Sequence, residues 1–160
     1  MFKIRPITYS DIPFLWEMLY QSIYVSAGEA PPSKDIINEP DLAKYVEGWG
    51  REGDIGFIAL NSDNESIGSV TLRFFDESNK GYGFIDNKTP ELGMAILKEY
   101  RGRGIGTELI KAIIQEAKAK GIASISLSVD PNNLAMRLYR RFGFTEVGTA
   151  GTSVTMKLNL

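Results

Sequence analysis

The chain has 160 residues, 43% of them hydrophobic, and its 18 Lys and Arg residues against 20 Asp and Glu residues give a formal net charge of −2. This length predicts one compact domain spanning residues 1–160, and a charge balance without a basic stripe argues against a nucleic-acid partner. The chain contains no Cys and no His, which excludes disulfides, thiolate or imidazole metal sites and Ser-His-Asp triads. Proton transfer therefore falls to carboxylates, tyrosine, lysine, the backbone or water, and we expect no metal.

The N-terminal segment carries Lys3 and Arg5 where a secretory signal needs its apolar stretch. No run of about eighteen apolar residues occurs later in the chain, as a membrane-spanning helix would require. We therefore expect a cytoplasmic protein with no membrane partner. The sequence leaves the oligomeric state open, including a homodimer.

The first half of the chain has the pattern of antiparallel strands with two helices. Ser10-Asp11 followed by Pro13 is typical of a helix start, and the turn residues at 61–64 separate two apolar runs as in a hairpin. A proline-containing stretch at 27–40 and a glycine-rich one at 81–90 are predicted to be irregular. The predicted strands are 2–8, 55–60 and 67–75, and the predicted helices are 10–24 and 41–49.

The second half predicts a strand, helix, strand unit followed by another helix and two closing strands. Apolar residues recur every fourth position in the helix predicted at 104–120, so one stripe of it packs on the sheet. The stripe consists of Ile105, Leu109, Ile113 and Ala117. Asp130 is predicted to cap the next helix, with Pro131 at its first position and Phe142 near its end. The predicted strands are 92–97, 123–129, 144–147 and 154–158. The fold class is therefore α/β or α+β, a mixed sheet with helices on its faces.

A segment rich in glycine and arginine, residues 101–107, lies between the end of a buried strand and the start of an amphipathic helix. Its glycines allow the backbone to approach a ligand closely, and N–H groups at a helix N-terminus bind phosphate oxygens. Arg101 and Arg103 add guanidinium groups that suit a doubly charged pyrophosphate. A turn that merely joined strand to helix would need one glycine and no paired arginines. The segment predicts a site for a nucleotide-like cofactor.

Two other phosphate-binding loops fit this segment less well. A Walker A loop needs Gly-Lys followed by Ser or Thr, which is absent here. A dinucleotide-binding fold is closer, because a strand, glycines, a helix and a second strand ending in Asp130 follow its order. Its third glycine would fall at Thr107, however, and residues 98–101 put charges where a tight turn is required. NAD binding stays the minor alternative.

The glycine segment resembles the signature of the GNAT superfamily of N-acetyltransferases, in which Gln or Arg is followed after two residues by Gly, and after one more by Gly or Ala. Arg101, Gly104 and Gly106 match it. A second family segment is similar to Asn132, Ala135, Tyr139, Gly143 and Phe144. The resemblance extends over residues 91–144, and the order of elements fits along the whole chain. Lys98 departs from the pattern, because proline is frequent there in relatives.

The resemblance implies a single N-acetyltransferase domain with a mostly antiparallel mixed sheet and helices on both faces. The sheet would splay open between the strands near 92–97 and 123–129, with the pantetheine arm of acetyl-CoA in the gap. The residues that the resemblance assigns to acetyl-CoA are Ile96 and Leu97 through their backbone, then Arg101, Gly102, Arg103, Gly104, Ile105, Gly106 and Thr107, and finally Asn132. The implied reaction is direct attack of a primary amine on the thioester in a ternary complex, which suits a chain without Cys or His.

Two residues are candidates for the proton transfers. Glu91 opens the strand that leads to the gap, where a carboxylate can accept the proton of the amine directly or through water. The alternative is a solvated strand-end charge, since a bulge would turn it to the other face. Tyr139 is predicted to share a helix face with Asn132 and to look into the cleft. The resemblance favours Tyr139 as the acid that protonates the departing CoA thiolate, and the alternative is a half-buried packing residue.

The acceptor stays open among a small amine, an antibiotic, an amino acid and a protein N-terminus, because the segments least matched to the family would bind it. Residues 81–89 are candidates for a wall of the acceptor pocket, although a surface loop without a ligand role is the alternative. A non-catalytic CoA-binding sensor is the rival functional class, since it would keep the glycine segment without a usable acid or base.

Overall fold

The computed structural model describes all residues from 1 to 160 and contains one seven-stranded sheet with the strand order β1-β2-β3-β4-β5-β7-β6. The strands are β1 Phe2–Pro6, β2 Ile55–Asn61, β3 Ser66–Arg73, β4 Glu91–Ile96, β5 Ser124–Val129, β6 Thr145–Ala150 and β7 Ser153–Asn159. The α-helices are α1 Ile12–Gln21, α2 Pro40–Ala43, α3 Ile105–Ala119 and α4 Ala135–Arg141. Short 3-10 helices are Tyr9–Asp11, Lys34–Asn38 and Lys98–Tyr100.

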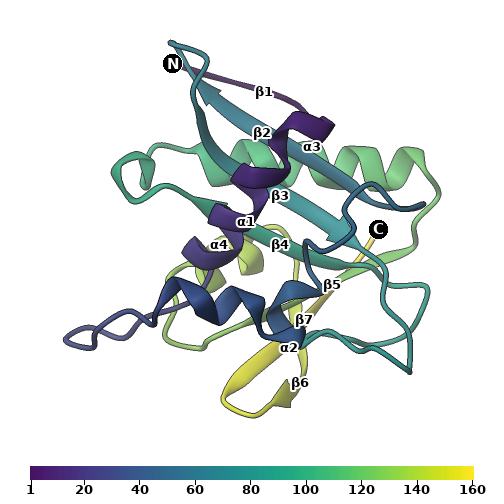
Figure 1. The fold of residues 1–160 in the computed structure, drawn as a ribbon. Coiled ribbons are helices and arrows are strands. Elements are labelled where there is room, and N and C mark those ends of the chain that lie inside the picture. Colours follow the sequence, from purple (N-terminus) through teal and green to yellow (C-terminus); the bar gives the residue numbers. More distant parts are fainter.

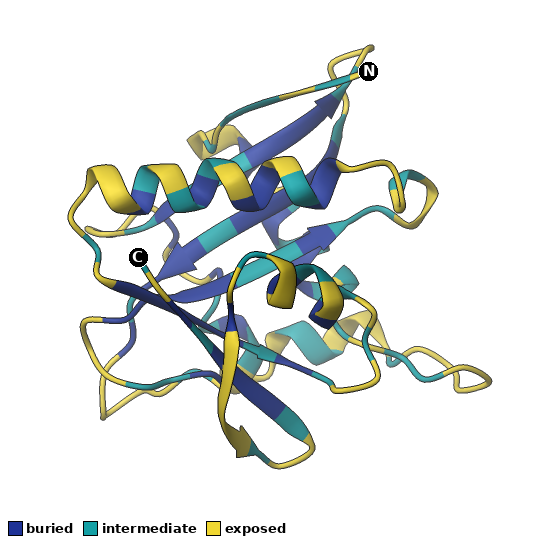
Figure 2. Ribbon diagram, turned by 180° about the vertical axis from the view of Figure 1, so that it is seen from behind, coloured by how far each residue is buried: buried dark blue, intermediate teal, exposed yellow.

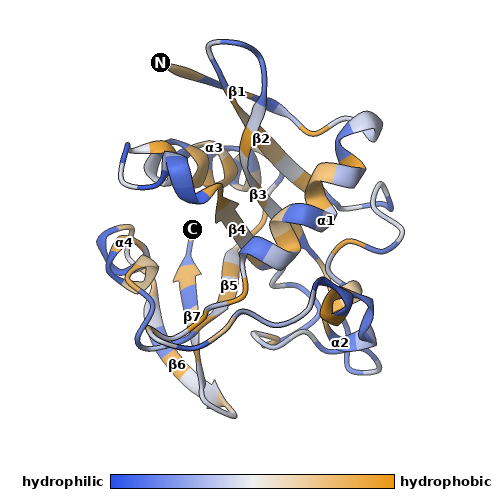
Figure 3. Cartoon of the chain, turned by 60° about the vertical axis from the view of Figure 1, so that its left-hand side comes forward, coloured by the Kyte–Doolittle hydropathy of each residue, from blue (hydrophilic) through white to orange (hydrophobic).

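Neighbouring strands run antiparallel except for β4 and β5, which are parallel. The helices form two layers, with α1 and α2 on one face of the sheet and α3 and α4 on the other (Figures 1 and 3). Each helix layer packs on the sheet around its own hydrophobic core. The larger core joins α3 and α4 to the sheet, and a smaller one joins Leu15, Leu19, Val46 and Trp49 to β2. The predicted class, a mostly antiparallel mixed sheet with helices on both faces, is confirmed.

Helix α3 shows why the sequence pattern was informative. Its predicted apolar stripe is buried, and Leu109, Ile113 and Ala117 are completely enclosed. The lysines of the opposite side, Lys111 and Lys118, are exposed, and Figure 2 shows this exposed side of the helix facing away from the strands. The helix therefore lies flat on the sheet, with its N-terminus next to the end of β4.

The opening between β4 and β5 is also present. These strands share a single register pair, Glu91 with Ser126, next to the hydrogen bond from the Ser126 N–H to the Pro90 carbonyl at 3.0 Å. A regular parallel pair would continue with further register pairs along both strands. Because only one pair forms here, the two strands separate toward the end of β4. The predicted splay is confirmed.

Two predicted helices differ from the structure. Helix α4 begins at Ala135 rather than at Pro131, and its N-cap is Leu134. Asp130 instead stabilises a turn, since its carboxylate accepts the Asn132 N–H at 2.9 Å. Such local side-chain bonds compete with helix formation. The helix predicted at 41–49 is likewise shorter, because α2 spans Pro40–Ala43 and turns follow it.

Candidate active site

Along the opening, the backbone of β4 has no strand partner on the β5 side beyond the single pair. The Leu97 N–H donates to the Ile67 carbonyl at 2.8 Å, so the backbone groups of Leu97 point toward β3. Because these groups alternate along a strand, those of Ile96 and Met94 point toward β5, beyond the single pair that joins the two strands. The Leu97 carbonyl also accepts the Tyr100 N–H. Ile96 therefore lines the opening, and Met94 lines it as well, which sequence reasoning missed.

The glycine segment folds into a tight turn that ends on the N-terminus of α3. Gly102 and Gly104 have φ of +76° and +83°, which side chains rarely tolerate. A Cβ at either position would have no atom of the protein within 4 Å, so the space beside this backbone is open. The Glu108 N–H bonds the Gly104 carbonyl, which leaves the first amides of the helix, those of Ile105, Gly106 and Thr107, without an intrahelical partner.

Gly106 is a glycine for a different reason. It is buried, and a Cβ there would lie 3.2 Å from the Leu138 side chain and 3.4 Å from those of Ile96 and Met94. The start of α3 is therefore in close contact with both β4 and α4. This contact places the free amides of the helix directly beside the opening in the sheet.

The two arginines of the segment are exposed. The Arg101 Nε donates to the Ile96 carbonyl at 3.0 Å, so its guanidinium lies at the edge of the opening. The Arg103 guanidinium lies 5.3 Å from the centre of the Tyr100 ring. Together with the free amides, these cations form a site suited to a pyrophosphate, and the residues present fit the group that the sequence predicted.

Glu91 lies at the closed end of the opening and is 4% exposed. Its Oε2 accepts the Tyr45 hydroxyl at 2.5 Å, and its Oε1 accepts the Gly83 N–H at 2.9 Å. Burial raises the pKa of Glu91 to about 7, although both hydrogen bonds and the charge of Lys44 lower it. The carboxylate is therefore not the solvated strand-end charge of the alternative interpretation. Tyr45 carries no sequence signal, because it lies 46 positions from Glu91 in the chain.

Tyr139 is also buried, at 6% exposure, and its ring packs edge-on against Phe144 with centroids 5.8 Å apart. Burial raises its pKa to about 12. Ser126 Oγ is the one fully enclosed side-chain polar atom without a hydrogen-bond partner. The Tyr139 hydroxyl also has no hydrogen-bond partner in the chain. Since Ser126 Oγ is the only such atom that is fully enclosed, the Tyr139 hydroxyl keeps some exposure. The predicted shared helix face with Asn132 is wrong, because Asn132 is an exposed residue of the turn before α4.

The segment 81–85 packs on β5 and borders a groove. A Cβ at Gly83 would lie 2.7 Å from the Leu127 carbonyl carbon, so this backbone rests directly on the strand. The groove, of about 330 Å³, lies between Phe84 and Ile85 on one side and strands β6 and β7 on the other. Lys157 is the ionisable residue that lines it. Side chains alternate between the two faces of a strand. Since Val154, Met156 and Leu158 belong to the core under α3 and α4, Lys157 points to the other face of the sheet. Glu91 points to that same face, because its neighbour Leu92 also belongs to this core.

No group of three or more His, Cys, Asp or Glu side chains could hold a metal ion. No helix combines the length and the apolar character that crossing a membrane requires.

The mixed sheet opens between two parallel strands and has a glycine turn and a free helix N-terminus at one end of the opening and a buried carboxylate at the other, an arrangement suited to a phosphate-bearing ligand. The model of the acetyltransferase (GNAT) family matches residues 16–144. The chain belongs to this family, and the resemblance predicted from the two motifs is confirmed.

Curated relatives include N-alpha-acetyltransferase 30 of Schizosaccharomyces pombe, which is 44% identical over 104 residues covering 62% of this chain and 61% of that protein. A probable spermine N(1)-acetyltransferase of Bacillus subtilis subsp. natto is 41% identical over 92 residues, covering 54% of this chain and 57% of that protein. The match thus spans about three fifths of the length of these relatives.

Solved structures share the fold across the whole chain. The PaiA N-acetyltransferase of Thermoplasma acidophilum, solved in complex with coenzyme A, has a TM-score of 0.71 and 20% identity, covering 100% of this chain and 99% of that one. A GNAT-family acetyltransferase of Staphylococcus aureus Mu50 has a TM-score of 0.73 and 22% identity, with the same coverage.

Proposed function

We propose that residues 1–160 act as one N-acetyltransferase domain that moves an acetyl group from acetyl-CoA to a primary amine by direct attack in a ternary complex. The observation that carries the proposal is the position of Glu91, a buried carboxylate with a pKa of about 7 at the closed end of an opening whose other end is an anion site. A proton acceptor and a phosphate site at the two ends of one gap suit a long cosubstrate that lies between them.

The residues at the open end would hold the cosubstrate. Free amides at the start of α3 and the open backbone at Gly102 and Gly104 favour pyrophosphate oxygens, and Arg101 and Arg103 add charge. The backbone of Ile96, with that of Met94, would bond the pantetheine arm, and Leu97 would border it. Asn132, in the exposed turn before α4, would contact the cofactor from the other side of the opening.

Acetyl-CoA supplies a thioester whose carbonyl carbon accepts the amine nitrogen. Glu91 would accept the proton that the amine loses as the new N–C bond forms, directly or through water. Tyr139, whose phenol is protonated at neutral pH and whose pKa burial raises further, would donate a proton to the sulfur as the C–S bond breaks. The products are then an amide and the free thiol of CoA, the proton on Glu91 leaves to solvent, and Tyr139 regains a proton from solvent.

The acceptor would bind in the groove between Phe84 and strands β6 and β7, which opens on the same face of the sheet as Glu91. Phe84 directly follows Gly83, whose N–H binds the Glu91 carboxylate, so the groove begins next to the proton acceptor. The positive charge of Lys157 disfavours acceptors that carry a second cation near the reacting amine. We therefore place peptide-like or neutral small amines ahead of polyamines.

Two rival functions are less well supported. A dinucleotide-binding fold needs a largely parallel sheet, whereas β4 and β5 are the one parallel pair here. A non-catalytic CoA sensor would have no use for a buried carboxylate with a pKa near neutrality. Melting temperatures separate the ligands, because a ligand that binds the native state raises the melting temperature by mass action. We expect acetyl-CoA and CoA to do so and NAD not to, and equal stabilisation by NAD would favour the dinucleotide function.

A further inference from the structure

The hydroxyl of Tyr45 connects three separate parts of the site. It donates to Glu91 Oε2 at 2.5 Å and accepts the Tyr82 N–H at 2.7 Å. The next amide, that of Gly83, donates to the other carboxylate oxygen. A Cβ at Gly81 would collide with both the carboxylate and the Tyr45 hydroxyl, so the segment 81–83 lies in direct contact with this pair.

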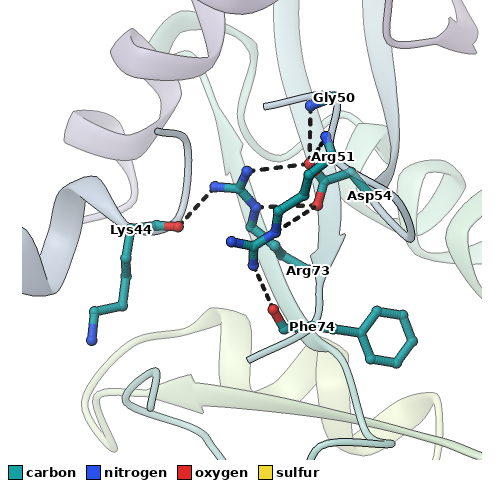
Figure 4. A network of polar contacts seen from close by, with 6 residues as sticks. All are labelled: Lys44, Gly50, Arg51, Asp54, Arg73 and Phe74. Atoms are coloured by element: carbon teal, nitrogen blue, oxygen red, sulfur yellow. Dashed lines mark hydrogen bonds and ion pairs between the residues drawn. The ribbon is translucent and has the colours of Figure 1, made fainter. Parts of the chain in front are cut away.

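Tyr45 is itself held from behind by a buried ion pair. The Arg73 guanidinium binds the Asp54 carboxylate at 3.1 and 3.2 Å, and its Nη1 donates to the Lys44 carbonyl at 2.8 Å. Asp54 also accepts the amides of Gly50 and Arg51. Figure 4 shows Arg73 bound to the Lys44 carbonyl and to Asp54, while Asp54 holds the Gly50 amide, so the ion pair fastens both ends of the segment 44–50 to the sheet. Because Lys44 directly precedes Tyr45, the bond from Arg73 to the Lys44 carbonyl also fixes the backbone of Tyr45.

We propose that Tyr45 is a positioning residue for Glu91. The Tyr45 hydroxyl fixes the Glu91 carboxylate in one orientation and holds the segment 81–83 over it. The proposal rests on the function proposed above, since it assigns Glu91 a proton-accepting role. The hydroxyl is the natural donor in this pair, because burial and the charge of Glu91 raise the pKa of Tyr45 well above its ordinary value. We therefore assign Tyr45 a positioning role and leave the proton transfer to Glu91.

The hydrogen bond has a chemical consequence as well as a geometric one. It stabilises the charged form of Glu91 and so offsets part of the burial that raises the pKa of this carboxyl. The other charged groups near the carboxylate are Lys44, which also lowers the pKa of Glu91, and Arg73, which lies opposite it on β3 but is bound to Asp54. The ring of Tyr82 stacks on that of Tyr45.

The test is Tyr45→Phe, which removes the hydroxyl and keeps the ring. A hydrogen bond to a charged group corresponds to a pKa change of about one to two units, so the pKa of Glu91, followed by carboxyl carbon NMR, should rise by about one unit or more. The acid limb of kcat/KM should move to higher pH by the same amount. Tyr20→Phe is the matched control, because the Tyr20 hydroxyl donates to the Pro32 carbonyl at 2.6 Å, and its acid limb should stay in place.

A second variant guards against misfolding of the first. Replacing Tyr45 by 3-fluorotyrosine keeps the ring and the hydroxyl but makes the phenol a stronger donor, so the pKa of Glu91 should fall. Opposite movements in the two variants support the proposal, and an unchanged pKa of Glu91 in folded protein overturns it. The NMR titration needs no turnover. If the pKa moves while no amine is acetylated, Tyr45 positions Glu91 but the proposed acetyltransferase function fails.

Discussion

Glu91 and Ser126 form the single pair that joins β4 to the parallel strand β5. The sheet is closed at this pair and open beyond it, which fixes where a cosubstrate can enter and how far it can reach. The carboxylate stands at this limit, while the glycine turn and the N-terminus of α3 stand at the other end of β4.

The proposed anion site predicts that Gly104→Asn weakens CoA binding. Asn tolerates positive φ better than most residues, so the variant should fold with a cost of about 1 kcal/mol, while its side chain would fill the open space beside the turn. Gly121→Asn is the matched control. It has φ of +76°, also has no atom within 4 Å of a Cβ, and lies just beyond the other end of α3. Calorimetry should show lower CoA affinity for Gly104→Asn alone, and equal affinity in both variants would remove the turn from the site.

The proposed acid predicts that Tyr139→Phe lowers turnover without lowering CoA affinity. Loss of a general acid typically costs about 10² to 10⁴ in rate. Stability should change little, because the hydroxyl has no hydrogen-bond partner in the chain to lose. Steady-state rates need to be read with the chemical step limiting, so that product release does not mask the effect. A rate near that of the wild type under these conditions would leave Tyr139 as a packing residue.

Burial of Glu91 predicts a pH-dependent difference in stability between the wild type and Glu91→Gln. The pKa of this carboxyl is about 7 in the folded protein against an ordinary 4.5, so between these values the folded state holds a proton that the unfolded state has lost. Stability from this group is full below pH 4.5 and is lost as the pH rises to about 7. The loss is on the order of 3 kcal/mol.

Urea unfolding of both proteins across this window measures the effect, because the other titrating groups are shared. The free energy of unfolding of the wild type should fall relative to that of Glu91→Gln as the pH rises. A constant difference across the window would mean that Glu91 titrates like an exposed carboxyl.

The groove predicts that Lys157→Glu changes acceptor preference. Reversing this charge should raise kcat/KM for a polyamine relative to that for a neutral amine, by about tenfold for each 1.4 kcal/mol of altered interaction. Lys118→Glu, on the exposed side of α3, makes the same change of charge away from the groove and should leave the ratio as it is. A ratio that moves equally in both variants would indicate only a general effect of net charge.

Local patterns predicted part of the fold and most of the residues of the candidate site. The glycine segment, the stripe of α3 and the strand that begins at Glu91 each depend on neighbouring residues, and the structure contains all three. The start of α4 was missed because the Asp130 side chain bonds the Asn132 amide and forms a turn, which competes with the helix signal of Asp-Pro.

Tyr45 could not be predicted, because its contact with Glu91 depends on how the segment after α2 packs on the sheet. That packing is determined by the Arg73 contacts to Asp54 and to the Lys44 carbonyl, which join residues 19 and 29 positions apart. Met94 was missed for a simpler reason. Whether its backbone groups point toward β5 or toward β3 follows from the register of β4 with β3, which the sequence does not reveal.

The most direct test of the account is a screen of primary amines with acetyl-CoA, read as release of the CoA thiol and as acetylated product, with wild type and Glu91→Gln side by side. We expect at least one neutral or peptide-like amine to be acetylated in step with thiol release. The Glu91→Gln rate should be lower by about 10² to 10⁴ above pH 7, where the wild-type carboxylate is ionised. Thiol release that is the same with and without any amine, in a protein that binds CoA, would contradict the account and leave a CoA-binding protein without transferase activity.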